Sequence, residues 1–176
     1  MIDQQGGRRR GFAVADGLTP AEVEHVHREA LRVLRRDIDA AHLDAYSDEA
    51  WPPAVVGSCE RALSLAREEV ALGTRSSRDD LGMGIDIDVR DDGQFAVMVD
   101  LAPYTISAEG RDGDRLIFSA NDTGTSLWIA VTGEQETVLR SRLEALGVPS
   151  TALVPHSPRR RRRLRSWFAR AEPGDR

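Results

Sequence analysis

The sequence predicts an α+β fold in which helices cover one face of an antiparallel sheet. Two observations predict it. Three segments carry apolar residues spaced three and four apart, which is typical of amphipathic helices, and the segments between the second and third helix alternate apolar with polar residues, which is typical of strands. The expected order is α-α-β-β-β-β-α. This order describes a four-stranded antiparallel meander, with two N-terminal helices and one C-terminal helix packed on one face.

The two N-terminal helices are predicted from capping residues and periodicity. The first is expected over about 19–45, because Thr19 and Glu22 can form a capping box around a proline at the first helical position. Its apolar stripe continues as far as Ala45. The second helix is expected over about 53–72, where Gly73 supplies a C-terminal cap.

A change of apolar spacing at Met83 predicts the first hairpin. Apolar residues then occupy every second position over 83–90, as in a half-buried strand. The turn residues 91–93 end in glycine, and a three-residue loop keeps apolar positions opposite one another. In the predicted register Val89 lies opposite Phe95, Ile87 opposite Val97 and Ile85 opposite Val99.

Turn residues and alternation also predict strands over 104–108, 116–120 and 127–131. The last helix is expected to begin after Thr132, in a second possible capping box, and to stop at Gly147.

The charge is distributed unevenly along the 176 residues. All 24 basic side chains are arginine and 29 side chains are acidic, so the formal net charge is −5. The absence of lysine excludes Schiff-base enzymes and phosphate-binding loops that need a lysine. Residues 11–150 contain 13 arginines and 26 acidic residues, whereas 151–176 contain eight and two. We therefore expect a flexible N-terminal arm (1–17), an acidic α+β domain (18–148), a proline-containing linker (149–158) and an arginine-rich tail (159–176).

The single cysteine and the hydropathy suggest a cytoplasmic protein without a transmembrane segment. No apolar run approaches the roughly 18 residues of a membrane span. Cys59 lies in an apolar stripe, where a small buried hydrophobe is the expected role, and His27 lies near another. A packed histidine is the expectation for His27, and a pH switch is the alternative. No catalytic constellation, metal site or cofactor motif is found, so we expect a protein that is not an enzyme and holds no cofactor.

The predicted outer face of the sheet carries three large apolar side chains. Met98, Ile117 and Trp128 would form a partner-binding patch there, with Asp86 and Asp88 at its acidic edge. The alternative is that the last helix or the tail covers this face.

The tail is the strongest local feature of the sequence. Residues 159–170 contain seven arginines and no acidic residue. Such a segment can bind phosphates of nucleic acid, lie on an anionic membrane or dock on an acidic protein surface, including the acidic body of this chain. The polyanion-binding residues expected here are Arg159, Arg160, Arg161, Arg162, Arg163, Arg165 and Trp167.

These features predict a non-enzymatic binding or adaptor protein. Its acidic body and basic tail would engage a protein partner, in a regulatory or immunity-like role. The alternative is a nucleic-acid-binding protein that uses the arginine-rich tail, with help from Arg8 to Arg10, for non-specific phosphate contacts.

Overall fold

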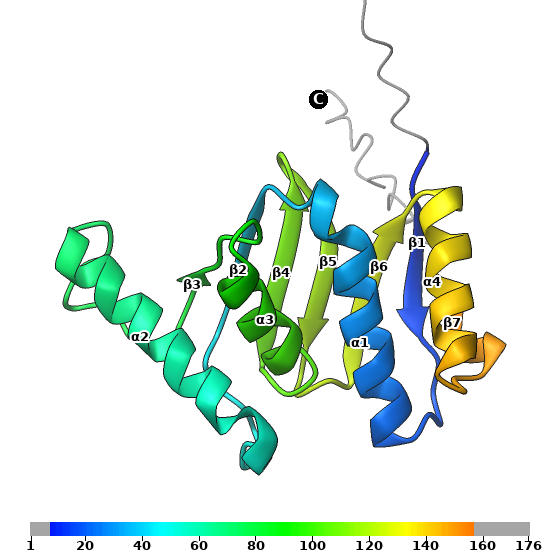
Figure 1. Ribbon diagram of the computed structural model, residues 1–176, viewed down its shortest axis with the longest axis horizontal. Helices are drawn as coiled ribbons and strands as arrows, with labels where there is room; N and C mark the ends of the chain where they lie inside the picture. The colour runs from blue at the N-terminus through cyan, green and yellow to red at the C-terminus, as the bar shows by residue number, and fades with distance from the viewer. Residues whose placement is uncertain (1–7, 157–176) are drawn as a thin grey trace, which may run out of the picture.

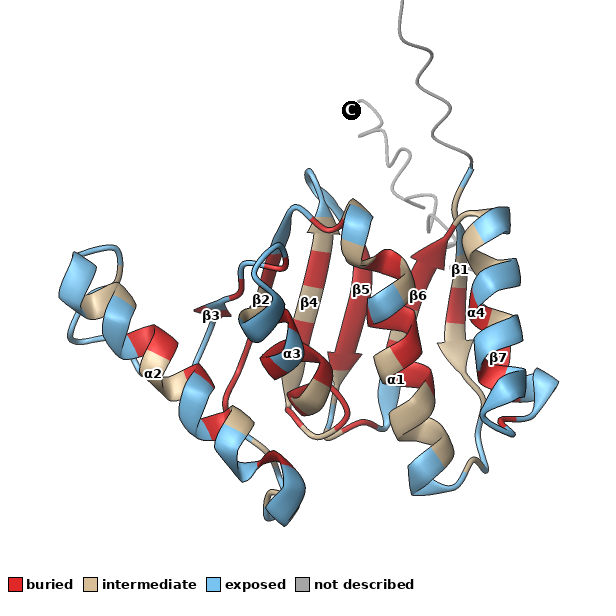
Figure 2. Ribbon diagram, viewed as in Figure 1, coloured by how far each residue is buried: buried red, intermediate tan, exposed pale blue. Residues whose placement is uncertain are grey.

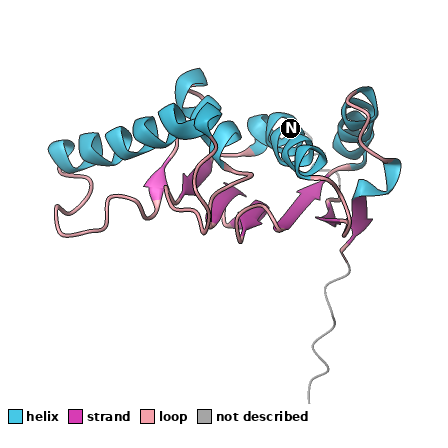
Figure 3. Cartoon of the chain, turned by 90° about the horizontal axis from the view of Figure 1, so that it is seen from below, coloured by secondary structure: helices cyan, strands magenta, loops and turns pink. Residues whose placement is uncertain are grey.

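The computed structural model describes residues 8–156, which fold into one antiparallel sheet with helices on a single face (Figure 1, Figure 3). Within this range the sheet has seven strands, in the order β3-β2-β4-β5-β6-β1-β7. The strands are β1 (Arg10–Val14), β2 (Ala40–Leu43), β3 (Ile85–Asp86), β4 (Ser107–Asp112), β5 (Arg115–Asn121), β6 (Ser126–Val131) and β7 (Leu153–Pro155). The helices are α1 (Pro20–Leu34), α2 (Val56–Leu72), α3 (Asp92–Leu101) and α4 (Gly133–Ala145).

The α+β class and the one-sided layering agree with the sequence prediction, but the four-stranded meander with three helices is wrong. Seven strands and four α-helices are present in the described residues. The additional strands arise in unexpected places. β1 lies in the segment expected to be an arm, β2 in the second half of the expected first helix, and β7 in the expected linker.

Helix α1 begins as predicted and ends eleven residues early. Thr19 and Glu22 form the expected capping box. After Leu34 the chain passes through one turn of 3-10 helix (Arg35–Asp37) into β2. The buried residues here are Ala41, Leu43 and Ala45, which are spaced by two as in a strand. Over such a short stretch this pattern also fits a helix, and the sequence prediction therefore extended the helix too far.

The predicted hairpin around residues 91–93 is wrong, because α3 occupies its second arm. The Asp91 side chain accepts a hydrogen bond from the Gln94 backbone N–H at 2.8 Å and so caps the helix. Helix α3 packs against both α1 and α2. Apolar residues therefore occur on most sides of α3, and a nearly continuous apolar run does not distinguish a buried helix from a strand. β3 is correspondingly short.

The second half of the chain follows the prediction more closely. β4, β5 and β6 form an antiparallel meander, with Phe118 opposite both Gly110 and Ile129. The β4–β5 turn contains Gly113 with a φ of +57°, a backbone conformation that favours glycine. Helix α4 starts with the predicted capping box of Thr132 and Gln135.

The hydrophobic core lies between the sheet and the helices (Figure 2). Leu31 and Leu34 of α1, Phe118 of β5, Ile129 of β6 and Leu139 of α4 are completely buried there. Within residues 8–156, no helix covers the opposite face of the sheet (Figure 3). Among residues 8–156, no helix is both long enough and apolar enough to cross a bilayer.

Candidate functional site

The uncovered face of the sheet carries a row of side chains that crosses every strand. The strand register places these residues side by side, and all of them point away from the helices, because Phe118 and Ile129 at alternate positions point toward them. In sheet order the row consists of Asp86, His42, Glu109, Ser119, Trp128, Ala13 and Val154. We call this side of the sheet the open face.

The β2–β4 part of the open face is polar and internally paired. The Glu109 carboxylate accepts a hydrogen bond from the Arg111 guanidinium at 3.0 Å and lies 3.5 Å from His42 Nε2. The Arg111 side chain balances the charge of Glu109 locally. This part of the face therefore presents little uncompensated charge at neutral pH.

A groove with a volume of about 1010 Å³ lies over the β5–β6–β1–β7 part of the structure. Trp128 of β6 is its large aromatic side chain. A Cβ atom added to Gly11 would lie only 3.1 Å from Trp128 Nε1, so the indole ring passes directly over the glycine of the neighbouring strand. Arg8, Arg115 and His156 also line this groove, which we call the Trp128 groove.

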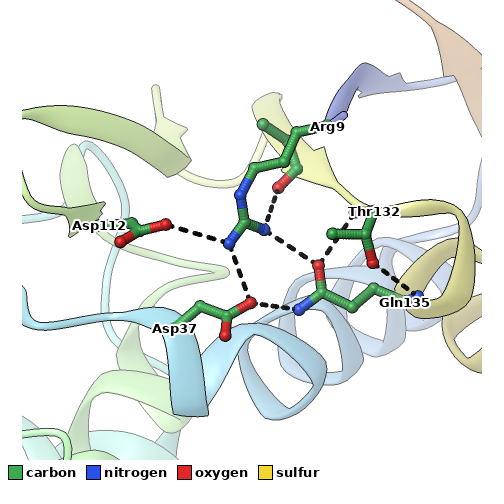
Figure 4. Close-up of polar contacts among 6 residues, drawn as sticks. Arg9, Asp37, Asp112, Thr132 and Gln135 are labelled. Carbon is green, nitrogen blue, oxygen red and sulfur yellow. Dashed lines mark hydrogen bonds and ion pairs between the residues drawn. The ribbon is translucent and has the colours of Figure 1, made fainter. Parts of the chain in front are cut away.

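Two of the arginines beside the groove are neutralised by the protein. Arg9 is nearly buried and joins the segment before β1 to four other parts of the fold (Figure 4). Its guanidinium donates to Asp37 at 2.9 Å and to Asp112 at 3.2 Å. It also donates to Gln135 Oε1 at 3.0 Å and to the Ala130 carbonyl at 3.2 Å. These contacts give Arg9 a structural role.

Arg10 is the second arginine of the groove that an acidic side chain neutralises, whereas Arg8 and Arg115 have no such partner in the described residues. Arg10 pairs with Glu136 of α4 and lies over the Phe12 ring. Within residues 8–156, neither Arg8 nor Arg115 forms an ion pair. The Trp128 groove therefore has two surplus positive charges beside an indole ring, which suits an anionic ligand with planar groups.

The structure separates the predicted patch of Met98, Ile117 and Trp128. Only Trp128 is available on the open face. Met98 is completely buried in α3, on the helix side of the sheet, because the segment is a helix and not a strand. Ile117 is also completely buried.

The two predicted acidic residues also separate. Asp86 lies in edge strand β3, at the far end of the row from Trp128. Asp88 lies in the loop before α3, where its carboxylate accepts from the Arg90 backbone N–H at 2.9 Å. The predicted polyanion-binding residues at 159–163, 165 and 167 lie outside the described residues.

Sequence reasoning did not bring together the residues that build the groove with Trp128. It considered Arg8 to Arg10 only as an aid to the tail in nucleic-acid binding, and it assigned no role to Arg115 or His156. A signal was present in Arg8 to Arg10 as a basic cluster, but its position depends on β1 inserting between β6 and β7. This long-range pairing has no local signature.

A second hollow, of about 410 Å³, lies beside the end of α2. The Arg75 guanidinium occupies the polar groups that line this hollow. It pairs with Glu69 at 2.6 Å and donates to the carbonyl oxygens of Met83 and Gly84 at 2.8 and 2.6 Å. These bonds hold the loop after α2, so we assign this hollow a structural role.

The two reactive side chains of the core are poorly suited to catalysis. Burial, together with the nearby Glu60 charge, raises the pKa of the Cys59 thiol, which disfavours the thiolate. Burial lowers the pKa of His27 to about 4, and its Nδ1 lies 2.8 Å from the Val23 carbonyl oxygen. In the described part of the chain, no group of three or more His, Cys, Asp or Glu side chains could hold a metal ion.

Comparison of the chain with protein-family models, curated proteins and solved structures returned no match.

Proposed function

We propose that this protein is a non-catalytic binding or adaptor protein that docks a protein partner on the open face of its sheet. The observation that carries the proposal is the one-sided architecture (Figure 3). All helices of residues 8–156 pack on one face, and the other face presents a cross-strand row with Asp86 at one end and Trp128 toward the other. Aromatic residues framed by polar side chains are typical of protein interfaces.

The reactive groups of the core support a binding role. The Cys59 thiol is disfavoured as a nucleophile and His27 is buried as the neutral imidazole, so neither offers the exposed, activated group that catalysis needs. A cytoplasmic location belongs to the same proposal, because a chain with one cysteine cannot rely on an internal disulfide.

Site-specific photo-crosslinking tests this function. A benzophenone side chain is introduced at Val154, on the open face, in the full-length protein within cells that produce it. The matched control is Val138 on α4, because both valines are 41% exposed. We expect a discrete protein adduct from position 154 alone that survives nuclease treatment and disappears with Trp128→Ala. The same adducts from both positions, or none from position 154, would contradict the proposal.

A second candidate function is nucleic-acid binding. The specific observation that favours it is the position of His156, the last described residue, in the wall of the Trp128 groove beside Arg8 and Arg115. The arginine run 159–163 begins three residues later in the sequence. Arginines are the side chains through which proteins release counterions from phosphates.

A further inference from the structure

We propose that the Trp128 groove binds single-stranded nucleic acid, with the indole ring stacking on a base and Arg8 and Arg115 contacting phosphates. This inference rests on the second candidate function and gives it a site in the folded body. Two features of the described residues support it, the surplus positive charge of the groove and its aromatic surface.

The charge of the groove suits a polyanion. Arg9 is neutralised by Asp37 and Asp112, and Arg10 pairs with Glu136. Arg8 and Arg115 remain as surplus cations within the described residues. Positive side chains along a groove are the feature by which proteins follow a nucleic-acid backbone without reading its sequence.

The aromatic surface makes a single strand the better ligand. The Trp128 indole packs over Gly11 and also lines the groove. Unpaired bases can stack on such a ring, whereas the bases of a duplex are already stacked on one another. An acidic peptide would use the arginines and leave the indole without a planar partner.

The arginine run 159–163 lies close to the groove in the sequence. His156 lines the groove, and the run begins three residues later. The variants in the test separate the contribution of the run from that of the groove.

The acidic character of the body does not prevent this binding. On the open face beside the groove, Glu109 is paired with Arg111 at 3.0 Å. The Debye length is about 8 Å at physiological ionic strength, so the other acidic residues of the body are largely screened beyond that distance.

The test measures fluorescence anisotropy of labelled 12-nucleotide RNA and DNA single strands with the full-length protein over a range of salt concentrations. We expect Arg115→Gln to weaken binding several-fold and to lower the magnitude of the salt slope by about 0.7, the value for one phosphate contact on a single strand. Trp128→Ala should weaken binding by about five-fold or more with little change in slope, and Trp128→Phe should lose less. The matched control is Arg67→Gln, an exposed arginine on α2 outside the groove, which should bind like the wild type.

Other arms of the experiment separate the groove from the tail and from other ligands. If replacing the five arginines 159–163 by glutamine abolishes binding while the groove variants bind like the wild type, nucleic-acid binding stands and the groove proposal is wrong. Tighter binding of a 12-base-pair duplex, or equal binding of a polyglutamate peptide that is insensitive to Trp128→Ala, also overturns it. Absence of binding by the wild type rejects the site and the second candidate function together. Arg115→Gln and Trp128→Phe keep the test decisive if Trp128→Ala does not fold.

Discussion

Trp128 lies over Gly11 of the adjacent strand, with its Nε1 atom 3.1 Å from the position that a Cβ of residue 11 would take. The carbonyl oxygen of His156 is 3.3 Å from the same position. A side chain larger than hydrogen at position 11 would therefore meet both the indole ring and the backbone just after β7. Gly11 determines how deeply the indole ring sits in the groove.

Gly11→Ala is expected to displace the Trp128 indole by a few tenths of an ångström and to destabilise the fold by about 1 kcal/mol. The indole N–H resonance of Trp128 in an NMR spectrum, assigned with Trp128→Phe, should shift. Gly133→Ala is the matched control, because Gly133 also lines the groove but a Cβ there meets no atom within 4 Å. An unchanged resonance in Gly11→Ala would contradict the close approach.

Removal of Arg9 is expected to destabilise the protein, because Arg9 links β1 to Asp37, Asp112 and α4 (Figure 4). The Arg9 side chain is 8% exposed, while its carboxylate partners are 34% and 49% exposed, so solvent reduces the loss. We expect Arg9→Met to lower the free energy of unfolding by about 2–3 kcal/mol in urea titrations. Arg10→Met, which removes an arginine that is 63% exposed, should cost less than about 1 kcal/mol. Equal losses of unfolding free energy from the two variants would contradict the expectation that burial makes the Arg9 contacts the stronger ones.

Acid is expected to destabilise the protein through His27. Burial lowers its pKa to about 4, whereas the unfolded chain has an ordinary histidine pKa near 6.5. Between these values the unfolded state binds the proton more tightly, so stability falls as pH decreases from about 6.5 to 4. The linkage relation gives a loss of about 2 kcal/mol at pH 5 relative to neutral pH.

The measurement is the free energy of unfolding of the wild type and His27→Leu at pH 7.5 and pH 5. Carboxylates contribute equally to both proteins, so the difference between them isolates His27. A wild type that loses no more stability than His27→Leu would contradict the assigned pKa.

Cys59 is expected to react slowly with thiol reagents in the native protein. Burial limits the access of reagents to the Cys59 thiol and also raises its pKa, and both effects reduce the concentration of accessible thiolate. Reaction with a dithiobis-nitrobenzoate reagent should be at least about ten-fold slower than for free cysteine, and should become rapid in urea. Fast native labelling would instead place Cys59 among reactive thiols and weaken the case for a non-catalytic protein.

Local signals in the sequence predicted the elements that depend on nearby residues. The capping boxes at Thr19 and Thr132 formed, because their hydrogen bonds join residues only three apart. Helix α2 ended at Gly73, which has a φ of +76° and so adopts the left-handed conformation of a C-terminal cap. The meander of β4 to β6 was also predicted, since short turns connect its strands.

The predictions that failed depend on distant parts of the chain. The run from Phe95 to Val99 was predicted to be a strand, but contacts with α1 and α2 stabilise it as a helix. Met98 consequently lies in the core and not on the outer face of the sheet, where it was predicted. Strand β2 also depends on a distant segment. Its buried residues are spaced by two because β4 pairs with it, and over four residues this spacing alone does not distinguish a strand from a helix.

By itself, the sequence determined the α+β class, the caps of α1 and α4, the acidic body and the arginine-rich tail, because composition and hydrogen bonds between near neighbours are local properties. Only the tertiary structure decided that β1 inserts between β6 and β7, that Arg9 is buried and that Trp128 lies in a groove with Arg8 and Arg115. The β1–β6 pairing, the Arg9–Asp112 contact and the approach of Arg8 to the Trp128 groove join residues more than a hundred positions apart. Such pairings are selected by the burial of whole faces of the sheet, which no short segment encodes.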